Sequence, residues 1–245
     1  MKRRLVLLAS ALAAASTRAQ VPKLDDLVKG ATGALPKSGT AGAGGTDAKT
    51  DAAGLKEALA VGTERAVKSL GRENGFFGNA AVKILMPSSL QKVAEVAKMA
   101  GYQKQVDEFI LSMNRAAEAA VPLAATYFGD AIRDMSFDDA RAILTGGDTA
   151  ATQFFRRKTG DKLAAAFKPV VSEKVNQVGA TRAYKEMMGR YEKVPLMGGQ
   201  SLDLDDYVTK KSLDGLFLVL GQEEKKIRTN PAARTTDLLK QVFGK

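Results

Sequence analysis

Three short strings place serine, lysine and asparagine where an acylating hydrolase needs them. They are Ser89-Leu-Gln-Lys92, Ser112-Met-Asn114 and Lys158-Thr-Gly160, in the chain order of the motifs of serine β-lactamases and penicillin-binding proteins. In that chemistry, a lysine one helical turn from a serine removes the hydroxyl proton. The third string would have to lie on a sheet edge, but here it falls in a helical pattern, and the intervals are too short for that fold. We therefore predict no catalytic serine.

The densest basic cluster begins at Arg156 and continues through Arg157 and Lys158. With Arg182 these residues are our candidates for anion binding, because guanidinium groups bind carboxylate or phosphate through two parallel hydrogen bonds. The alternative is a solvated helix face with no ligand. The two phenylalanines before the cluster are more typical of a core than of a base-stacking surface, so nucleic acid is not a predicted partner.

Six polar residues lie among alanine and leucine in otherwise apolar helical segments. They are Asn114, Arg115, Glu118, Asp139, Arg141 and Asp214. We expect some of them to be half-buried and paired with one another, which fixes the register of the helices. A polar network without a catalytic role is the favoured interpretation, although perturbed groups of this kind also occur at active sites.

Asp203, Asp205 and Asp206 form an acidic cluster at the expected start of a helix. A calcium loop needs further oxygen ligands at alternating positions and a glycine at the turn, and Tyr207 and Val208 stand where those ligands should continue. Carboxylates in a first helical turn are favoured by the helix dipole alone. We predict no metal site here.

The chain of 245 residues contains no histidine and no cysteine. These absences exclude Ser-His-Asp and Cys-His catalysis, ordinary zinc sites and disulfide bonds. Any catalysis would have to use carboxylates, lysine, tyrosine, hydroxyl groups or a hard cation. We expect no cofactor and name no catalytic residue.

The formal net charge of +10 is unevenly distributed. Residues 151–245 contain 18 Lys and Arg against 11 Asp and Glu, whereas residues 20–150 contain 15 against 16. A basic C-terminal half indicates an acidic partner or an anionic surface, such as lipid head groups or an acidic polymer of the cell envelope. Peripheral membrane contact is compatible with this charge, and so is a protein partner.

The N-terminal residues have the pattern of a secretory signal peptide. A basic start at residues 2–4 precedes an apolar run from Leu5 to Ala15, and Thr17-Arg-Ala19 offers a small-x-small cleavage site. We expect cleavage near Ala19 and a periplasmic or secreted protein without a transmembrane segment after processing. Residues 20–50, rich in Gly, Ala, Ser and Thr, are the predicted flexible linker.

Residues 51–245 are predicted to form one all-α domain of about eight helices. Apolar residues recur at helical spacing, and glycine or proline ends most segments, as at Gly71 and Pro122. Ser88 with Gln91 predicts a capping box, Ser136 predicts a second helix start, and the longest helix is expected to run from residue 106 towards Pro122. At most a short two-stranded ribbon is expected, from residues 82–86 and 194–197.

Several longer strings resemble an exported bacterial family of helical proteins, domain-of-unknown-function family 4197. They are Gly54-Leu-Lys-Glu-Ala-Leu59, Val61-Gly-Thr-Glu-Arg-Ala66, Ser112-Met-Asn-Arg-Ala-Ala-Glu118, Phe137-Asp-Asp-Ala-Arg-Ala-Ile-Leu144, Ala151-Thr-Gln-Phe-Phe-Arg-Arg157, Gly179-Ala-Thr-Arg-Ala-Tyr184, Leu213-Asp-Gly-Leu-Phe217 and Ile227-Arg-Thr-Asn-Pro231. The resemblance covers most of residues 51–245. It implies a helical domain behind a signal peptide, and it implies no activity, ligand or catalytic residue.

Three functions remain open from the sequence. The first is an exported, non-catalytic envelope protein that binds a partner or an anionic surface through its basic C-terminal half. The second is a hydrolase that uses Asp or Glu with Arg in a helical cleft. The third is a structural helical bundle that oligomerises through an exposed apolar patch.

Overall fold

The computed structural model describes residues 48–177, 203–234, 236–237 and 240. Several predictions lie outside these residues: the signal peptide, most of the linker, the ribbon segment at 194–197 and Arg182.

The regular secondary structure of the described residues is entirely helical, which confirms the all-α prediction. It consists of seven α-helices and two short 3₁₀ helices: α2 (Ala48–Leu70), α3 (Ser88–Met99), α4 (Gln103–Ala120), η1 (Val121–Leu123), α5 (Ala124–Arg133), α6 (Phe137–Thr145), α7 (Ala150–Gln177), α9 (Leu204–Thr229) and η2 (Pro231–Ala233). Within these ranges no helix is both long enough and apolar enough to cross a lipid bilayer.

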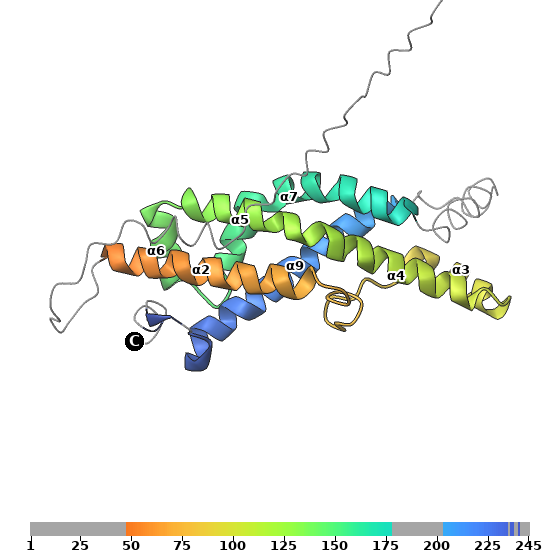
Figure 1. Ribbon diagram of the computed structural model, residues 1–245, viewed down its shortest axis with the longest axis horizontal. Coiled ribbons are helices and arrows are strands. Elements are labelled where there is room, and N and C mark those ends of the chain that lie inside the picture. The colour runs from red at the N-terminus through yellow and green to blue at the C-terminus, as the bar shows by residue number, and fades with distance from the viewer. Residues whose placement is uncertain (1–47, 178–202, 235, 238–239, 241–245) are drawn as a thin grey trace, which may run out of the picture.

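The two longest described helices, α7 and α9, pack against each other, and α9 runs obliquely across the structure (Figure 1). Helix α4 packs on α7, and α2 packs on both α9 and α5. Helix α3 packs on α4, and the two form a hairpin that extends from one end of the molecule (Figure 1). The prediction that the longest helix runs from residue 106 to Pro122 is wrong, because α7 is longer and continues through Pro169.

Aromatic side chains fill the centre of the core. The ring of Phe128 lies 4.9 Å from that of Phe155 and 6.1 Å from that of Phe217, centroid to centroid. Phe154 and Phe155 are 2% and 0% exposed, so the prediction that they face inward is confirmed. Rings at these distances and tilts attract one another beyond simple burial, and they join α5, α7 and α9.

Local signals in the sequence account for several helix ends. Helix α2 stops at Leu70, directly before Gly71, and α4 gives way at Ala120 to the 3₁₀ turn that contains Pro122. Ser136 caps α6 as predicted. Its hydroxyl accepts from the Asp139 N–H at 3.1 Å, and the Asp139 carboxylate accepts from the Ser136 N–H at 3.2 Å. This reciprocal pair is a capping box.

The capping box predicted for Ser88 and Gln91 is wrong. Helix α3 begins at Ser88 itself, and the residue in the capping position is Pro87, which has no side-chain hydrogen bond to offer. The serine therefore stands one residue too late, since a cap must precede the first helical residue.

The ribbon segment predicted at residues 82–86 forms no strand. The side-chain amide of Asn114 on α4 takes the place of a partner strand at Ile84. Its oxygen accepts from the Ile84 N–H at 2.9 Å, and its nitrogen donates to the Ile84 carbonyl at 2.8 Å. Both backbone groups of a buried residue are thereby satisfied, as burial requires.

Candidate functional site

The first turn of α7 is held by Glu224, a buried residue of α9. Its carboxylate accepts from the N–H of Ala151 at 2.9 Å and from the N–H and hydroxyl of Thr152, both at 2.8 Å. The first N–H groups of a helix have no partner within the helix and carry its positive dipole end. Glu224 thus serves as the N-terminal cap of α7, although it is 73 residues away from Ala151 in the sequence.

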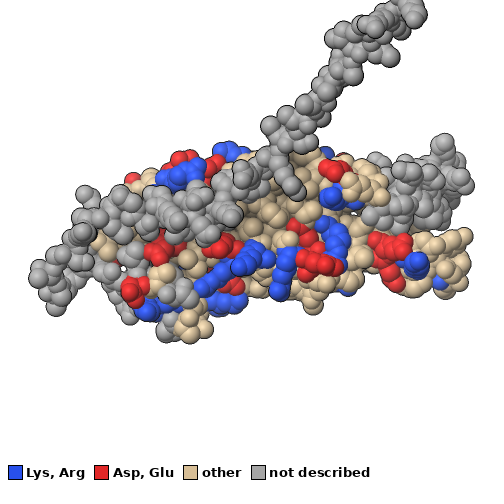
Figure 2. Space-filling model, viewed as in Figure 1, with Lys and Arg blue, Asp and Glu red and all other residues tan. Residues whose placement is uncertain are grey.

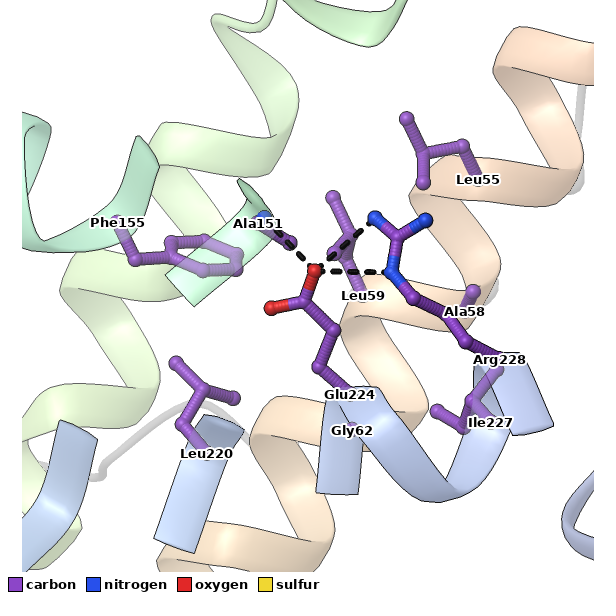
Figure 3. Close-up of a pocket in the computed structure, with 10 residues that line it drawn as sticks. All are labelled: Leu55, Ala58, Leu59, Gly62, Ala151, Phe155, Leu220, Glu224, Ile227 and Arg228. Carbon is purple, nitrogen blue, oxygen red and sulfur yellow. Dashed lines mark hydrogen bonds and ion pairs between the residues drawn. The ribbon is translucent and has the colours of Figure 1, made fainter. Parts of the chain in front are cut away.

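Arg228 completes this cap from the next turn of α9. It donates to Glu224 through Nε at 3.1 Å and through Nη2 at 3.0 Å (Figure 3). Its Nη2 also donates to the carbonyl of Ile143 on α6 at 2.8 Å. The side chains of Arg228 and Glu224 are 13% and 7% exposed. The pair therefore ties α6, α7 and α9 together in a nearly dry environment.

A small cavity beside this pair is too narrow for a substrate. Aliphatic and aromatic side chains line most of it, from Leu55, Leu59 and Ile227 to Phe155 and Leu220 (Figure 3). Its volume of about 20 Å³ is close to the space that one water molecule needs. The cavity is therefore a gap in the packing.

A larger groove lies between α6 and the start of α7. It has a volume of about 300 Å³, at the small end of the range for ligand pockets. The lining residues come from both helices and the turn between them: Asp139, Ala142, Ile143, Gly146, Gly147, Thr149, Ala150, Gln153, Phe154 and Arg157. Polar donors, one carboxylate and an apolar portion share this groove, which makes it a candidate for a ligand site.

The two charged side chains of the groove, Asp139 and Arg157, differ in their hydrogen-bond partners. Asp139 is held by the Ser136 hydroxyl at 2.8 Å, and this hydrogen bond lowers the pKa of the Asp139 carboxyl. Arg157 forms no hydrogen bond or ion pair with any residue that the structure describes. Its five N–H donors are therefore available to an incoming anion.

The basic cluster of the sequence divides between two sides of α7. Arg156 turns to α9, where it lies 3.4 Å from the carboxylate of Asp214 and 4.6 Å from the centre of the Phe217 ring. Arg157 faces the groove, and the Lys158 ammonium lies 5.8 Å from the Phe154 ring. The structure thus separates Arg156 from Arg157 and Lys158, and the fourth residue of the predicted anion site, Arg182, lies outside the described residues.

The charges of the surface are mixed. On the face shown in Figure 2, Lys and Arg side chains alternate with Asp and Glu, and no single broad basic area stands out. Several cations of the C-terminal half pair with acids, among them Lys168 with Asp206 at 2.6 Å and Lys225 with Asp148 at 3.6 Å. These pairs reduce the net field that the composition alone suggests.

Arg115 and Glu118 lie together, as we expected for the polar residues of α4. Arg115 Nη1 donates to Glu118 Oε2 at 2.5 Å, and Glu118 Oε1 accepts from the N–H groups of Phe76 and Phe77 at 3.0 and 3.1 Å. Arg115 also reaches Glu73 and, at 2.9 Å, the side-chain oxygen of Asn74. This cluster holds the loop after α2.

The remaining polar candidates lie apart from that cluster. Arg141 lies over the ring of Phe137, 5.3 Å from its centre, and Asp214 pairs with Arg156. Asp139 belongs to the capping box of α6 and to the groove. The six residues thus form no single network, and the groove brings together one residue of the polar set, Asp139, and one of the anion-binding set, Arg157.

The acidic cluster at 203–206 caps a helix. The Asp203 carboxylate accepts from the N–H groups of Asp205 and Asp206 at 2.9 and 3.0 Å, and the hydrogen bond from Asp206 lowers the pKa of Asp203. Among the described residues, no group of three or more potential metal-ligating side chains is gathered at one point.

The serine and lysine strings also have structural roles. The Ser112 hydroxyl is buried and donates to the Phe109 carbonyl at 2.7 Å, and Lys158-Thr-Gly160 lies inside α7. The buried Thr159 hydroxyl donates to the Phe155 carbonyl at 2.7 Å. Such bonds turn the hydroxyl back onto its own helix.

Glu224 was missed by the sequence reasoning. One signal was present, because Glu224 and Arg228 are four residues apart on one helix, a spacing at which opposite charges pair. Nothing in the sequence indicated that the pair would be buried against α7, since its backbone partners are more than 70 residues away.

Comparison with known proteins gives a family for the chain but no related protein of known function. No curated protein and no solved structure matches the chain. A family model does match, over residues 45–244, and its description is "Protein of unknown function (DUF4197)". The resemblance drawn from the sequence is thereby confirmed, and the chain belongs to the DUF4197 family of proteins of unknown function.

Proposed function

We propose that this protein is an exported, non-catalytic binding protein that captures an anionic group in the groove between α6 and α7. The main support is the position of Arg157. This residue lines a groove of about 300 Å³ and forms no hydrogen bond or ion pair with the described residues. An arginine so placed favours a carboxylate or phosphate, which it binds through two parallel hydrogen bonds.

The other lining residues suggest what surrounds that anionic group. Gln153 and Thr149 offer further hydrogen bonds, while Ile143 and Phe154 offer apolar contact. The Asp139 carboxylate repels a second negative charge and attracts a cationic or hydroxyl group. The groove therefore suits a small ligand, or the head of a larger one, in which one anionic group stands beside a donor and a short apolar portion.

The buried carboxylates support binding over hydrolysis. Glu118 and Glu224 each accept hydrogen bonds from two backbone N–H groups and from an arginine. A general acid or base must exchange a proton with substrate within hydrogen-bond distance. The oxygens of both carboxylates are occupied by these hydrogen bonds, so the two side chains hold the fold.

The experiment is a calorimetric titration of the protein with inorganic phosphate and with acetate, at low and high salt. We expect Arg157→Gln to weaken binding by about tenfold or more, since hydrogen bonds to charged groups contribute about 1.5–3 kcal/mol. Arg72→Gln is the matched control, because Arg72 is exposed and the same charge is removed. Equal affinity for the two variants, or affinity that does not fall with salt, contradicts the proposal.

A further inference from the structure

The hairpin of α3 and α4 carries an apolar tip. Val96, Met99 and Tyr102 are 61%, 82% and 55% exposed. Further back the hairpin is packed internally, with Leu90, Val106 and Phe109 at most 8% exposed. The three tip side chains are thus surplus to the packing that holds the two helices together.

The backbone of the turn at the tip is held by a hydrogen-bonded motif. Helix α3 ends in a Schellman motif, in which Tyr102 N–H donates to the Ala97 carbonyl at 2.9 Å and Gly101 N–H to the Lys98 carbonyl at 3.0 Å. Gly101 adopts φ = 91°, a conformation that side-chain-bearing residues rarely take. The motif defines the backbone path between Met99 and Tyr102, which lie on the two sides of the turn.

The charges of the tip favour an anionic surface. Residues 96–104 contain two lysines, Lys98 and Lys104, and no acid. Glu95 directly precedes Val96 and is exposed, and Asp107 and Glu108 lie one helical turn beyond Lys104. The Lys104–Glu108 contact of 3.8 Å is largely solvated. Apolar side chains with a tyrosine, flanked by lysines, are typical of segments that enter the head-group region of a membrane.

The shape of the tip argues against a second copy as its partner. The α3–α4 hairpin forms one end of the described part of the molecule (Figure 1). A stable dimer buries roughly 1,200 Å² or more. The exposed parts of three side chains at one turn fall well short of that area.

We propose that the α3–α4 tip inserts into the interface of a phospholipid membrane with anionic head groups. Val96, Met99 and Tyr102 enter between the head groups, and Lys98 and Lys104 contact the phosphates. This surface is separate from the α6–α7 groove, and neither proposal depends on the other.

The absence of cysteine provides the test. A Met99→Cys variant of the full chain, labelled with an environment-sensitive fluorophore, carries its label at one position only. We expect a saturable blue shift with vesicles that contain phosphatidylglycerol and a much weaker one with pure phosphatidylcholine. Gln222→Cys on the exposed part of α9 is the matched control and should show no shift. Because the signal belongs to the labelled position, binding through another segment leaves it unchanged.

The lysines are tested in the same assay. Replacing Lys98 and Lys104 together by alanine should weaken partition into phosphatidylglycerol vesicles by about thirtyfold, since each basic residue near such a surface contributes roughly fivefold. An unshifted label at position 99, equal shifts at 99 and 222, or unchanged partition of the lysine variant would each overturn the proposal. A shift that grows with protein concentration without vesicles would also overturn it, in favour of a second copy.

Discussion

The loop after α2 and the first turn of α7 are held in the same way, each by a buried glutamate of another helix. Glu118 accepts from two consecutive N–H groups of the loop, and Glu224 accepts from two consecutive N–H groups of α7. In each case an arginine of the glutamate's own helix completes the arrangement. A buried glutamate paired with an arginine therefore holds the backbone in both segments.

The two pairs differ in how deeply they are buried. The Arg228 side chain is 13% exposed, whereas that of Arg115 is 33% exposed and shares its donors with the exposed Glu73. Glu224 also meets the positive end of a long helix, while Glu118 holds a loop. A buried charge that loses its partner costs more than an exposed one, so the α7 region should be the more sensitive.

The largest expected effect is that of Glu224→Ala. This change leaves the N–H groups of Ala151 and Thr152 and the Arg228 guanidinium without their carboxylate, and we expect a loss of about 3–5 kcal/mol in the free energy of unfolding. Urea unfolding measures it, with Glu224→Gln as the milder variant if the alanine form does not fold. Glu108→Ala, which removes an exposed carboxylate, should change stability by less than about 1 kcal/mol. Similar losses for the two alanine variants contradict the assigned role.

Glu118→Ala should have the next largest effect. The N–H groups of Phe76 and Phe77 lose their acceptor, but Arg115 keeps Glu73 and Asn74 as partners. We expect a loss of about 2–3 kcal/mol in the same unfolding experiment, since unsatisfied buried groups cost about 1–3 kcal/mol. A loss of stability larger than that of Glu224→Ala would contradict the expectation that the α7 region is more sensitive than the loop after α2.

Gly215→Ala tests the packing of the loop after α2, which Gly215 on α9 contacts from the side opposite Glu118. A methyl group at Gly215 on α9 would lie 2.7 Å from a ring carbon of Phe76, the residue whose N–H Glu118 binds. Overpacking of this kind costs about 1–3 kcal/mol. Gly160→Ala on α7, where the methyl meets nothing within 4 Å, should instead stabilise by up to about 1 kcal/mol. Thermal unfolding of both variants measures the two effects. Destabilisation by Gly160→Ala as well as by Gly215→Ala would contradict the expected difference between the two positions.

The smallest expected effect concerns the exposed cap of α9. Because hydrogen bonds from its own helix lower the pKa of Asp203, its contribution is present above the unfolded pKa of about 3.8 and is lost as the pH falls through the lower folded value. Solvent screening limits it to a few tenths of a kcal/mol. Carboxyl NMR titration should find the Asp203 pKa below 3.8, and a value at or above this would contradict the cap.

Features that depend on neighbouring residues were predicted from the sequence, and features that depend on remote contacts were not. Ser136 and Gly71 act on residues within one turn of themselves, and the helix ends they mark were predicted. Ser88 shows the limit of such signals, since a shift of one residue turned an apparent cap into the first residue of the helix. The Glu224 cap depends on contacts across more than 70 residues, which a single sequence does not encode in a readable pattern. The residues that line the α6–α7 groove all lie between 139 and 157, but the sequence does not show how the two helices are placed to leave a groove between them.

If the α6–α7 groove is a binding site, a change in the groove should alter phosphate affinity without altering the free energy of unfolding. Phosphate affinity and unfolding free energy should be measured together on Arg157→Gln and Glu118→Gln. We expect Arg157→Gln to lose affinity by about tenfold and to keep the stability of the unmodified protein. We expect Glu118→Gln to lose stability and to keep its affinity for phosphate. Loss of stability without loss of affinity in Arg157→Gln would show that this arginine supports the fold, and it would contradict the proposed function.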